Sequence, residues 1–292
     1  MPSKRSGPLA PGVAFITGGA RGLGNAIAVS FAKEGARGVV IVDIQDEETF
    51  ELGKKNVQDF GCECIAIRAD VTKEDDISNA VQQAVEHFGR IDYAANFAGV
   101  VGPSGPISEV SLTDWQKCQD VNSSGVFLAT KHEMRQMMTQ SGIGGVEDGR
   151  VAQRGSIVNC ASVNSQMAMT GTTAYTASKH ACLGITKAAA LEGRKFGVRV
   201  NCVSPGFLLT RMLEPIVKGD MGGAITGGVN EEVKKKGAGE VLWEGFEKRQ
   251  GRKAVFEEVG DVVVLLSTPR MSLVVGANLC VDGGFVINEG ND

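Results

Sequence analysis

The sequence predicts a single α/β domain built on a doubly wound parallel sheet. From residue 13 onward, short aliphatic runs alternate with longer segments whose apolar residues recur at helical spacing. Most of the short runs are continuously apolar, as is typical of strands covered on both faces. No internal repeat interrupts this alternation. The pattern is that of a Rossmann fold with seven strands and helices on both faces of the sheet.

The expected elements follow one another in strict order. Helices are expected between the strands, over residues 22–35, 46–60, 74–88, 112–140 and 174–196. The strands are expected at residues 13–17, 39–43, 64–70, 93–99, 156–162, 198–204 and 278–284. Residues 1–11 form an N-terminal extension, and residues 12–292 form the domain.

Two segments depart from the alternation. Residues 139–155 are polar and glycine-rich, which predicts a surface insertion before a strand. Residues 207–250 follow a strand end and mix apolar, glycine-rich and charged portions. Because ligands bind at the carboxyl edge of a parallel sheet, we expect this second segment to be a substrate lid. A solvated insertion is the alternative.

Composition excludes several classes of function. The formal net charge of -4 without a long basic run argues against nucleic acid as a partner. No apolar stretch approaches the length that spans a membrane, and the N-terminus lacks the apolar region of a secretory signal. An odd number of cysteines, seven, indicates reduced thiols and a cytoplasmic protein. Cys62 and Cys64 have no second Cys/His pair, so no metal site is expected.

A glycine-rich turn follows the first expected strand. Thr17 begins the stretch TGGARGLG, in which Gly18, Gly22 and Gly24 frame the entry into a helix. Glycines let a pyrophosphate approach the backbone, and the helix N-terminus supplies free N–H groups. Asp43 ends the next strand, where a carboxylate accepts hydrogen bonds from an adenosine ribose. Together these features predict a dinucleotide site.

The acidic residue also indicates which dinucleotide binds. The Asp43 carboxylate would repel the 2′-phosphate of NADP, which favours NAD as the cofactor. Arg21 in the glycine turn is the opposing observation, because a guanidinium pairs well with a phosphate.

One of only two tyrosines lies four residues before a lysine. If the stretch YTASK is helical, Tyr175 and Lys179 share one face of the helix. An unperturbed phenol, with a pKa near 10, is a poor base at neutral pH. A nearby ammonium, together with an oxidised nicotinamide, should lower that pKa and produce a general acid/base. Coincidental helix packing is the alternative.

These motifs together resemble the short-chain dehydrogenase/reductase family over nearly the whole chain, from about residue 12 to VDGG at 281–284. Their order and spacing match, and Ser162 precedes Tyr175 by 13 residues. The matching stretches are TGGARGLG, Asp70-Val71, NFAG at 96–99, Asn122 in DVNSSG, Ser162 in SIVNCAS, YTASK, and PGFLLT at 205–210.

The resemblance implies particular site residues. The catalytic residues would be Asn122, Ser162, Tyr175 and Lys179, with Ser162 bonding the substrate oxygen and Asn122 holding a water of a proton path. The cofactor would contact Gly18, Arg21, Gly22, Leu23, Gly24, Asp43, Ile44, Asp70, Val71, Asn96, Ala98, Gly99, Tyr175, Lys179, Pro205, Leu208 and Thr210. Asn96 also reads as a structural asparagine that ties neighbouring strands. Phe97 and Ala161 depart from the family's usual asparagine and serine.

We therefore expect an oxidoreductase that interconverts a secondary alcohol and a ketone. The apolar content of the lid favours a medium-sized hydrophobic metabolite, and the style of the chain resembles fungal members of natural-product pathways. The resemblance also implies a homodimer or homotetramer built through the helices at 112–140 and 174–196. Two alternatives remain open: a scaffold that senses the dinucleotide, and a non-redox reaction such as dehydration, epimerisation or cyclisation.

Overall fold

The computed structural model describes residues 9–143, 152–209 and 238–288. Within these ranges a seven-stranded sheet has the order β3-β2-β1-β4-β5-β6-β7, and every pairing is parallel. The strands are β1 (Val13–Thr17), β2 (Gly38–Asp43), β3 (Glu63–Arg68), β4 (Tyr93–Asn96), β5 (Gly155–Cys160), β6 (Val198–Pro205) and β7 (Asn278–Val281). The predicted doubly wound sheet is confirmed. The winding direction reverses between β1 and β4, which creates the crevice where such sheets bind ligands.

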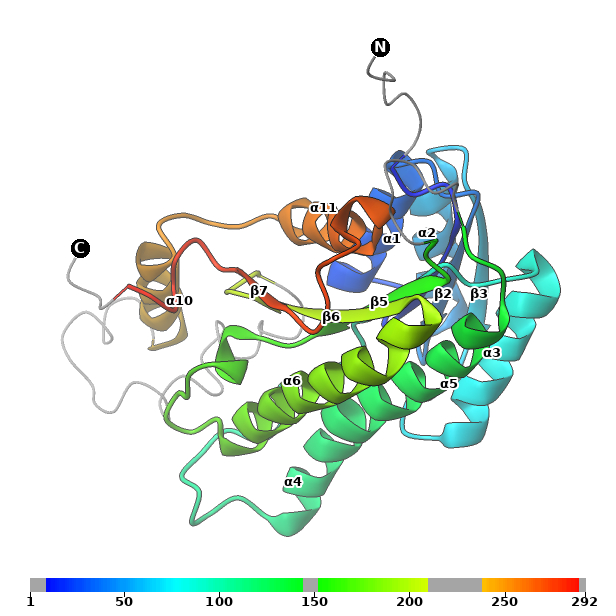
Figure 1. Cartoon of the computed structure of the whole chain (residues 1–292). Helices are drawn as coiled ribbons and strands as arrows, with labels where there is room; N and C mark the ends of the chain where they lie inside the picture. The colour runs from blue at the N-terminus through cyan, green and yellow to red at the C-terminus, as the bar shows by residue number, and fades with distance from the viewer. Residues whose placement is uncertain (1–8, 144–151, 210–237, 289–292) are drawn as a thin grey trace.

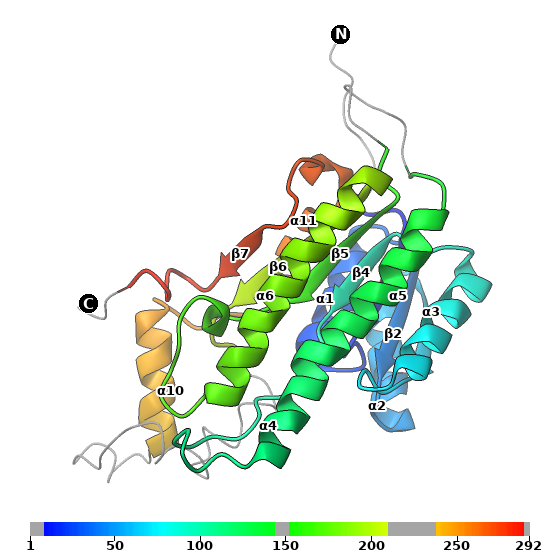
Figure 2. The same ribbon diagram turned by 60° about the horizontal axis from the view of Figure 1, so that its bottom comes forward.

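Helices cover both faces of the sheet (Figures 1 and 2). One face carries α1 (Gly22–Lys33), α2 (Glu47–Gln58) and α11 (Phe256–Ser267). The opposite face carries α3 (Glu74–Phe88), α4 (Leu112–Gln119), α5 (Val126–Thr139) and α6 (Thr173–Gly193). Helix α10 (Ala238–Arg249) stands apart from both layers, at the end of the sheet toward which β7 points (Figure 2).

The continuously apolar strands are explained by two cores, one on each face. In β1, Ala14 and Ile16 pack into the core beneath α1 and α11, while Val13 and Phe15 pack into the opposite core. Successive side chains of a strand point to opposite faces, so a strand with two covered faces has no position for a solvated residue. All five residues of β1 are buried.

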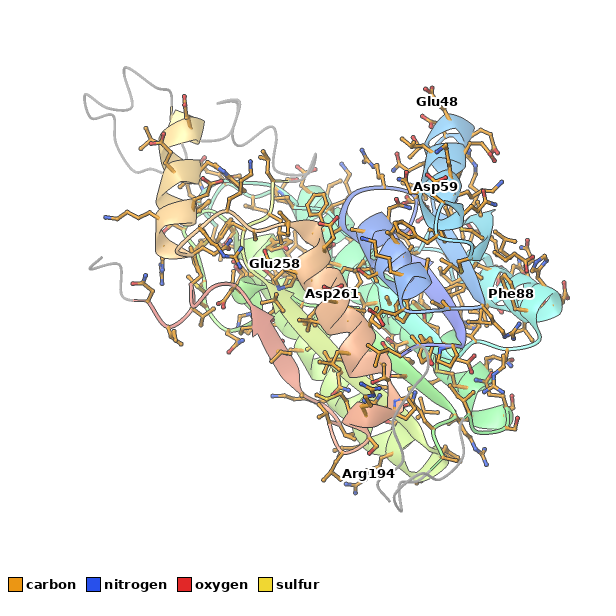
Figure 3. The ribbon with its side chains drawn as sticks, turned by 90° about the horizontal axis from the view of Figure 1, so that it is seen from above. Glu48, Asp59, Phe88, Arg194, Glu258 and Asp261 are labelled. Atoms are coloured by element: carbon orange, nitrogen blue, oxygen red, sulfur yellow. The ribbon has the colours of Figure 1, made fainter. Side chains whose placement is uncertain are left out.

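The two ends of the domain meet where α11 lies beside α1 (Figure 3). Gly260 permits this approach, because a Cβ at that position would lie 2.4 Å from the Ser30 hydroxyl oxygen. Ser30 Oγ in turn donates a hydrogen bond to Asp261 Oδ1 at 3.3 Å. These contacts anchor the C-terminal part of the chain against the helix that follows the glycine-rich turn.

Several element boundaries differ from the predicted ones. The single helix expected over 112–140 is α4, a π-helical segment at Asp120–Gly125, and α5. The strand expected at 93–99 ends at Asn96, and the last backbone hydrogen bond to its neighbour β1 is donated by the Phe97 N–H to the Thr17 carbonyl at 3.1 Å. Helical spacing of apolar residues does not distinguish a π turn from an α turn, so the sequence carries no signal for this change.

The two irregular segments are described only in part. At the base of the predicted insertion, Ile143 and Gln153 form an antiparallel bridge. Of the predicted lid, residues 207–209 and 238–250 are described, whereas Thr210 lies outside the described residues. Among the described residues, no helix is both long enough and apolar enough to cross a membrane.

Candidate active site

A cavity of about 990 Å³ opens at the carboxyl ends of the strands. Most of the residues predicted for the site line it: Gly18, Arg21, Gly22, Leu23, Gly24, Asp43, Ile44, Asp70, Val71, Ala98, Gly99, Ser162, Tyr175, Lys179, Pro205 and Leu208. Asn96 and Asn122 are not among the lining residues, and Thr210 lies outside the described residues.

At one end, the glycine-rich turn presents backbone N–H groups. Gly18 has a φ of +69°, and a Cβ there would lie 2.7 Å from the Ala98 nitrogen. A Cβ at Gly24 would lie 2.1 Å from the Gly18 carbonyl oxygen, so the helix can start this close to the strand only without a side chain. No side chain caps α1, and its first turn contains no acidic residue. The helix N-terminus is therefore free to bind an anion.

Beside this turn, Asp43 lies at the end of β2. Its Oδ2 accepts a hydrogen bond from the Ala20 N–H at 3.2 Å, and its Oδ1 accepts one from the Ile44 N–H at 2.8 Å. These bonds hold the carboxylate at the cavity, where each oxygen keeps a second lone pair for a ribose hydroxyl. The exposed side chain of Arg21 lines the same cavity. Arg21 is therefore placed where it could pair with the 2′-phosphate of NADP, as the argument against NAD assumes.

The reactive end is formed by the start of α6 and the end of β5. Lys179 Nζ lies 5.5 Å from the centre of the Tyr175 ring and donates a hydrogen bond to the Cys160 carbonyl at 2.8 Å. Ser162, two residues beyond β5, lies near Tyr175, and its hydroxyl acts to lower the pKa of the phenol. Its hydroxyl oxygen also accepts the Asn164 N–H at 3.2 Å. The helical spacing of Tyr175 and Lys179 therefore places the phenol and the ammonium together at the cavity, and the end of β5 brings the Ser162 hydroxyl to the same cavity.

Burial changes the protonation of this pair. It raises the pKa of the Tyr175 phenol, and the Lys179 ammonium opposes that rise without overcoming it. For Lys179, burial lowers the pKa and is the largest single influence, but the negative charges of ionised Tyr175 and of the thiolates of Cys160, Cys182 and Cys118 together outweigh it, so the net shift is upward. The lowering effect predicted for Lys179 is thus present, but the lysine alone does not make the phenol a stronger acid.

Asn122 lies behind the cavity wall, within the π-helical segment. Its Oδ1 accepts the Val100 N–H at 2.9 Å, and its Nδ2 donates to the Val100 carbonyl at 2.8 Å and to Ser178 Oγ at 3.1 Å. A Cβ on Gly99 would lie 3.3 Å from Asn122 Oδ1 and 3.9 Å from Lys179 Nζ. Gly99 therefore keeps the space between the amide and the ammonium open.

Asn96 is fully enclosed in the core. Its Nδ2 donates to Asn159 Oδ1 at 2.9 Å, which ties β4 to β5, and also to Glu133 Oε2 at 2.9 Å. Its Oδ1 accepts a hydrogen bond from Thr17 Oγ1 at 3.4 Å. These contacts favour the structural interpretation of Asn96 and account for the distance of its side chain from the cavity.

Several cavity residues were missed by sequence reasoning. The end of the cavity nearest α10 is lined by the apolar residues Phe207, Leu209, Trp243 and Phe246, and Phe256 at the start of α11 also lines the cavity. The spacing of Trp243 and Phe246 by three residues on a helix was the available signal, since it places both on one face. Met169 also lines the cavity, whereas Met167 does not.

Neither a reactive thiol nor a metal cluster appears at the site. Cys160 lines the cavity, and burial raises the pKa of its thiol against the opposing charge of Lys179. A raised pKa leaves the thiol protonated, which favours a passive role. In the described part of the chain, no group of three or more histidine, cysteine, aspartate or glutamate side chains is placed to hold a metal ion.

Comparison with known proteins gives a consistent result. The family pattern described as short chain dehydrogenase matches residues 12–220. The chain is 36% identical to the short-chain dehydrogenase fogB of Aspergillus ruber, over 94% of this chain and 97% of that protein. It is 35% identical to (+)-borneol dehydrogenase 2 of Salvia officinalis, over 94% and 88%. Among solved structures, NAD+-bound xylitol dehydrogenase matches with a TM-score of 0.81 at 27% identity, over 94% of this chain and 99% of that one.

Proposed function

The chain belongs to the short-chain dehydrogenase family and is an alcohol/ketone oxidoreductase, and we propose that it interconverts a secondary alcohol and a ketone with NAD(H) as cofactor. The observation that carries the proposal is the position of Tyr175, Lys179 and Ser162 on the cavity that the glycine-rich turn also lines.

The residues at the other end of this cavity fit a dinucleotide. The uncapped N-terminus of α1 and the close approaches of Gly18 and Gly24 suit a pyrophosphate, and Asp43 suits the adenosine ribose. Asp70, Val71, Ala98, Gly99, Pro205 and Leu208 would enclose the remainder. When bound, the nicotinamide supplies the acceptor or donor of a hydride and, in its oxidised form, a positive charge.

The chain's own residues manage the proton. During oxidation, Tyr175 as phenolate accepts the proton of the substrate hydroxyl, and during reduction the phenol returns it. The Ser162 hydroxyl donates to the substrate oxygen and stabilises the charge that develops there. Lys179 stays protonated and favours the phenolate by its charge. Asn122, next to Gly99, would hold the water through which Lys179 exchanges protons with solvent.

We also propose that the substrate is a medium-sized hydrophobic metabolite. It is supported by the apolar end of the cavity, with Phe207, Trp243 and Phe246. Relatives named for borneol and secoisolariciresinol, and the fungal relative fogB, are consistent with a role in secondary metabolism. The proposed preference for NAD over NADP is supported by the Asp43 carboxylate at the ribose position.

The test is a comparison of wild type with Tyr175→Phe on a panel of cyclic and acyclic secondary alcohols, followed by absorbance of NADH. Wild type should form NADH in equal amount to ketone. The variant should bind NADH with unchanged affinity and lose turnover by a factor of about 10² to 10⁴, the usual contribution of a general acid/base. Product without NADH would contradict redox chemistry, and an active Tyr175→Phe variant would contradict the role of the phenol.

A further inference from the structure

A buried glutamine outside the predicted site joins three segments at the apolar end of the cavity. Gln250, which directly follows α10, is only 3% exposed. Its Oε1 accepts the Phe207 N–H at 2.7 Å, and its Nε2 donates to the carbonyl oxygens of Phe207 at 3.3 Å and Arg252 at 3.2 Å. Both amide hydrogens and the amide oxygen are thus engaged, which fixes the side chain in one orientation.

Two glycines make room for this clamp. A Cβ at Gly206 would lie 2.3 Å from Gln250 Oε1, and a Cβ at Gly283 would lie 2.1 Å from the Gln250 carbonyl oxygen. The Gly206 N–H also donates to the Val281 carbonyl at 3.0 Å, which extends the pairing of β6 and β7. The chain after β6, the end of α10 and the chain after β7 therefore meet around one side chain.

The clamp supports a cluster of three phenylalanines, here called the aromatic wall: Phe207, Phe246 and Phe285. The rings of Phe207 and Phe246 stack with centroids 3.8 Å apart, and those of Phe207 and Phe285 lie 4.9 Å apart. Phe207 and Phe246 line the cavity, whereas Phe285 is 1% exposed and backs them. The Arg249 guanidinium lies 4.3 Å from the Phe285 ring centre and donates to the Phe285 carbonyl at 3.1 Å.

We propose that Gln250 is a positioning residue for substrate selection: by fixing Phe207 it holds the aromatic wall in place, so that the cavity accepts secondary alcohols with a rigid alicyclic body. This inference rests on the proposed function. Because the clamp holds the aromatic wall in one conformation before the substrate binds, the wall suits a substrate that is itself rigid. Neither partner then loses much conformational entropy on binding. A flexible acyclic alcohol loses more, and a polyol would bury hydroxyl groups against apolar rings without hydrogen-bond partners.

The test replaces Gln250 by methionine, which keeps its length and removes all three hydrogen bonds. Three probes are compared in the presence of NAD: borneol as a rigid bicyclic alcohol, 2-octanol as an acyclic one, and xylitol as a polyol. Wild type should prefer borneol. Gln250→Met should raise the KM for borneol about tenfold, because the loss of an aromatic contact has an effect of about that size. The ratio of kcat/KM for borneol to kcat/KM for 2-octanol should fall by about the same factor. The kcat should change little, since neither the clamp nor the aromatic wall contains a residue that handles the proton.

Two further variants keep the test decisive. Lys248→Ala is the control, because Lys248 lies at an exposed position of α10, the helix that Gln250 follows. It should leave the borneol to 2-octanol ratio of kcat/KM unchanged. Phe246→Leu leaves the clamp intact and removes one ring of the wall, so it should reduce the same ratio even if Gln250→Met is not obtained folded. Unchanged ratios in the variants of Gln250 and Phe246, or a wild type that prefers 2-octanol or xylitol, would overturn the inference. The proposed function would stand even if this inference failed, provided that wild type forms NADH and the Tyr175→Phe variant does not.

Discussion

The Asp43 carboxylate is the residue that bears most directly on cofactor choice. It is held at the cavity by the N–H groups of Ala20 and Ile44, and Arg21 lines the same cavity. Its negative charge disfavours a 2′-phosphate at the ribose it would contact, and removal of the charge leaves Arg21 free to attract that phosphate.

We therefore expect Asp43→Ala to increase the kcat/KM ratio of NADP to NAD by a factor of about ten or more, which corresponds to one charge interaction of about 1.4 kcal/mol. Initial rates with each cofactor at fixed substrate provide the measurement. If the ratio does not rise, the electrostatic account of Asp43 is wrong.

A second residue, Glu133 on α5, gives the fold a specific pH dependence. It is fully buried, and among the described residues its Oε1 has no hydrogen-bond partner while Asn96 alone donates to its Oε2. Burial raises the pKa of this carboxyl to about 8, against the opposing bond from Asn96. At pH values between the ordinary pKa of a glutamate and the raised one, Glu133 is therefore protonated in the folded chain and ionised in the unfolded chain. Stability contributed by this proton is present at low pH and is lost as the pH rises toward 8.

Glu133→Gln should remove that dependence, because an amide does not titrate. Wild type should lose stability relative to the variant as the pH rises from 5 to 8, by no more than about 1.4 kcal/mol for each pH unit. Urea unfolding of both proteins across this range measures the difference. Parallel stability curves would show that Glu133 is not protonated in the folded protein.

Glu133 and Gln250 also show what the sequence leaves hidden at the residue scale. The cofactor and catalytic residues were predicted because each belongs to a motif of fixed spacing, such as YTASK. Glu133 and Gln250 belong to no such motif, and their roles arise only when α5 meets the sheet and α10 meets the chain after β6. The neighbouring sequence does not show whether a glutamate on a helix is buried or exposed to solvent, because tertiary packing decides its burial.

At the scale of elements, the junction of β1 and α1 depends on residues that have no side chain. Gly24 lies in the first turn of α1, and a Cβ there would approach the Gly18 carbonyl oxygen to 2.1 Å. The helix would have to shift away from the strand, which would displace the N–H groups that we propose to bind the pyrophosphate. This consequence follows from backbone positions and is independent of the substrate.

Gly24→Ala is accordingly expected to weaken NADH binding by about tenfold to a hundredfold, since overpacking a close contact costs about 1–3 kcal/mol. Fluorescence titration with NADH measures this affinity. Gly184→Ala is the matched control, because a Cβ at that exposed position of α6 has nothing within 4 Å. A folded Gly24→Ala variant with wild-type affinity would contradict the assignment of this turn.

The helix between β4 and β5 shows the limit of periodicity as a guide to elements. The sequence pattern predicted its start and end closely, but the π-helical segment at Asp120–Gly125 was not visible in it. The extra residue of a π turn shifts the register of the helix, and Asn122 lies within that turn. The position of Asn122 beside Gly99 and Lys179 is therefore a product of an irregularity that apolar spacing does not encode.

At the scale of the whole molecule, α4, α5 and α6 expose large apolar side chains. Leu112 is 79% exposed, Leu191 is 60% exposed and Phe127 is 50% exposed. Exposed apolar residues on adjacent helices are typical of association surfaces. On this basis we propose that the chain forms a homodimer or homotetramer through these helices.

Charges on this surface should prevent such an assembly. Wild type is expected to have a solution mass that is a multiple of the 30.7 kDa chain. Phe127→Glu combined with Leu191→Glu should shift it to the monomer, because association would bury unpaired charges. Phe60→Glu, an apolar residue of similar exposure beyond α2, serves as the control. Light scattering coupled to size exclusion measures the masses, and a monomeric wild type would contradict the proposed assembly.

The central claim concerns the ionisation of one phenol, and the chain offers a direct way to observe it. It contains two tyrosines, and burial raises the pKa of the other, Tyr93, far above the working range. The ultraviolet difference between wild type and Tyr175→Phe therefore reports the ionisation of Tyr175 alone.

The decisive measurement is this difference titration with and without saturating oxidised NAD. We predict ionisation above the ordinary phenol value of about 10 without cofactor, and well below it with the oxidised cofactor bound, where a second positive charge joins that of Lys179. Lys179→Met should move the titration of the complex back toward higher pH. A phenol that still ionises at or above pH 10 in the complex would contradict its role as the general acid/base.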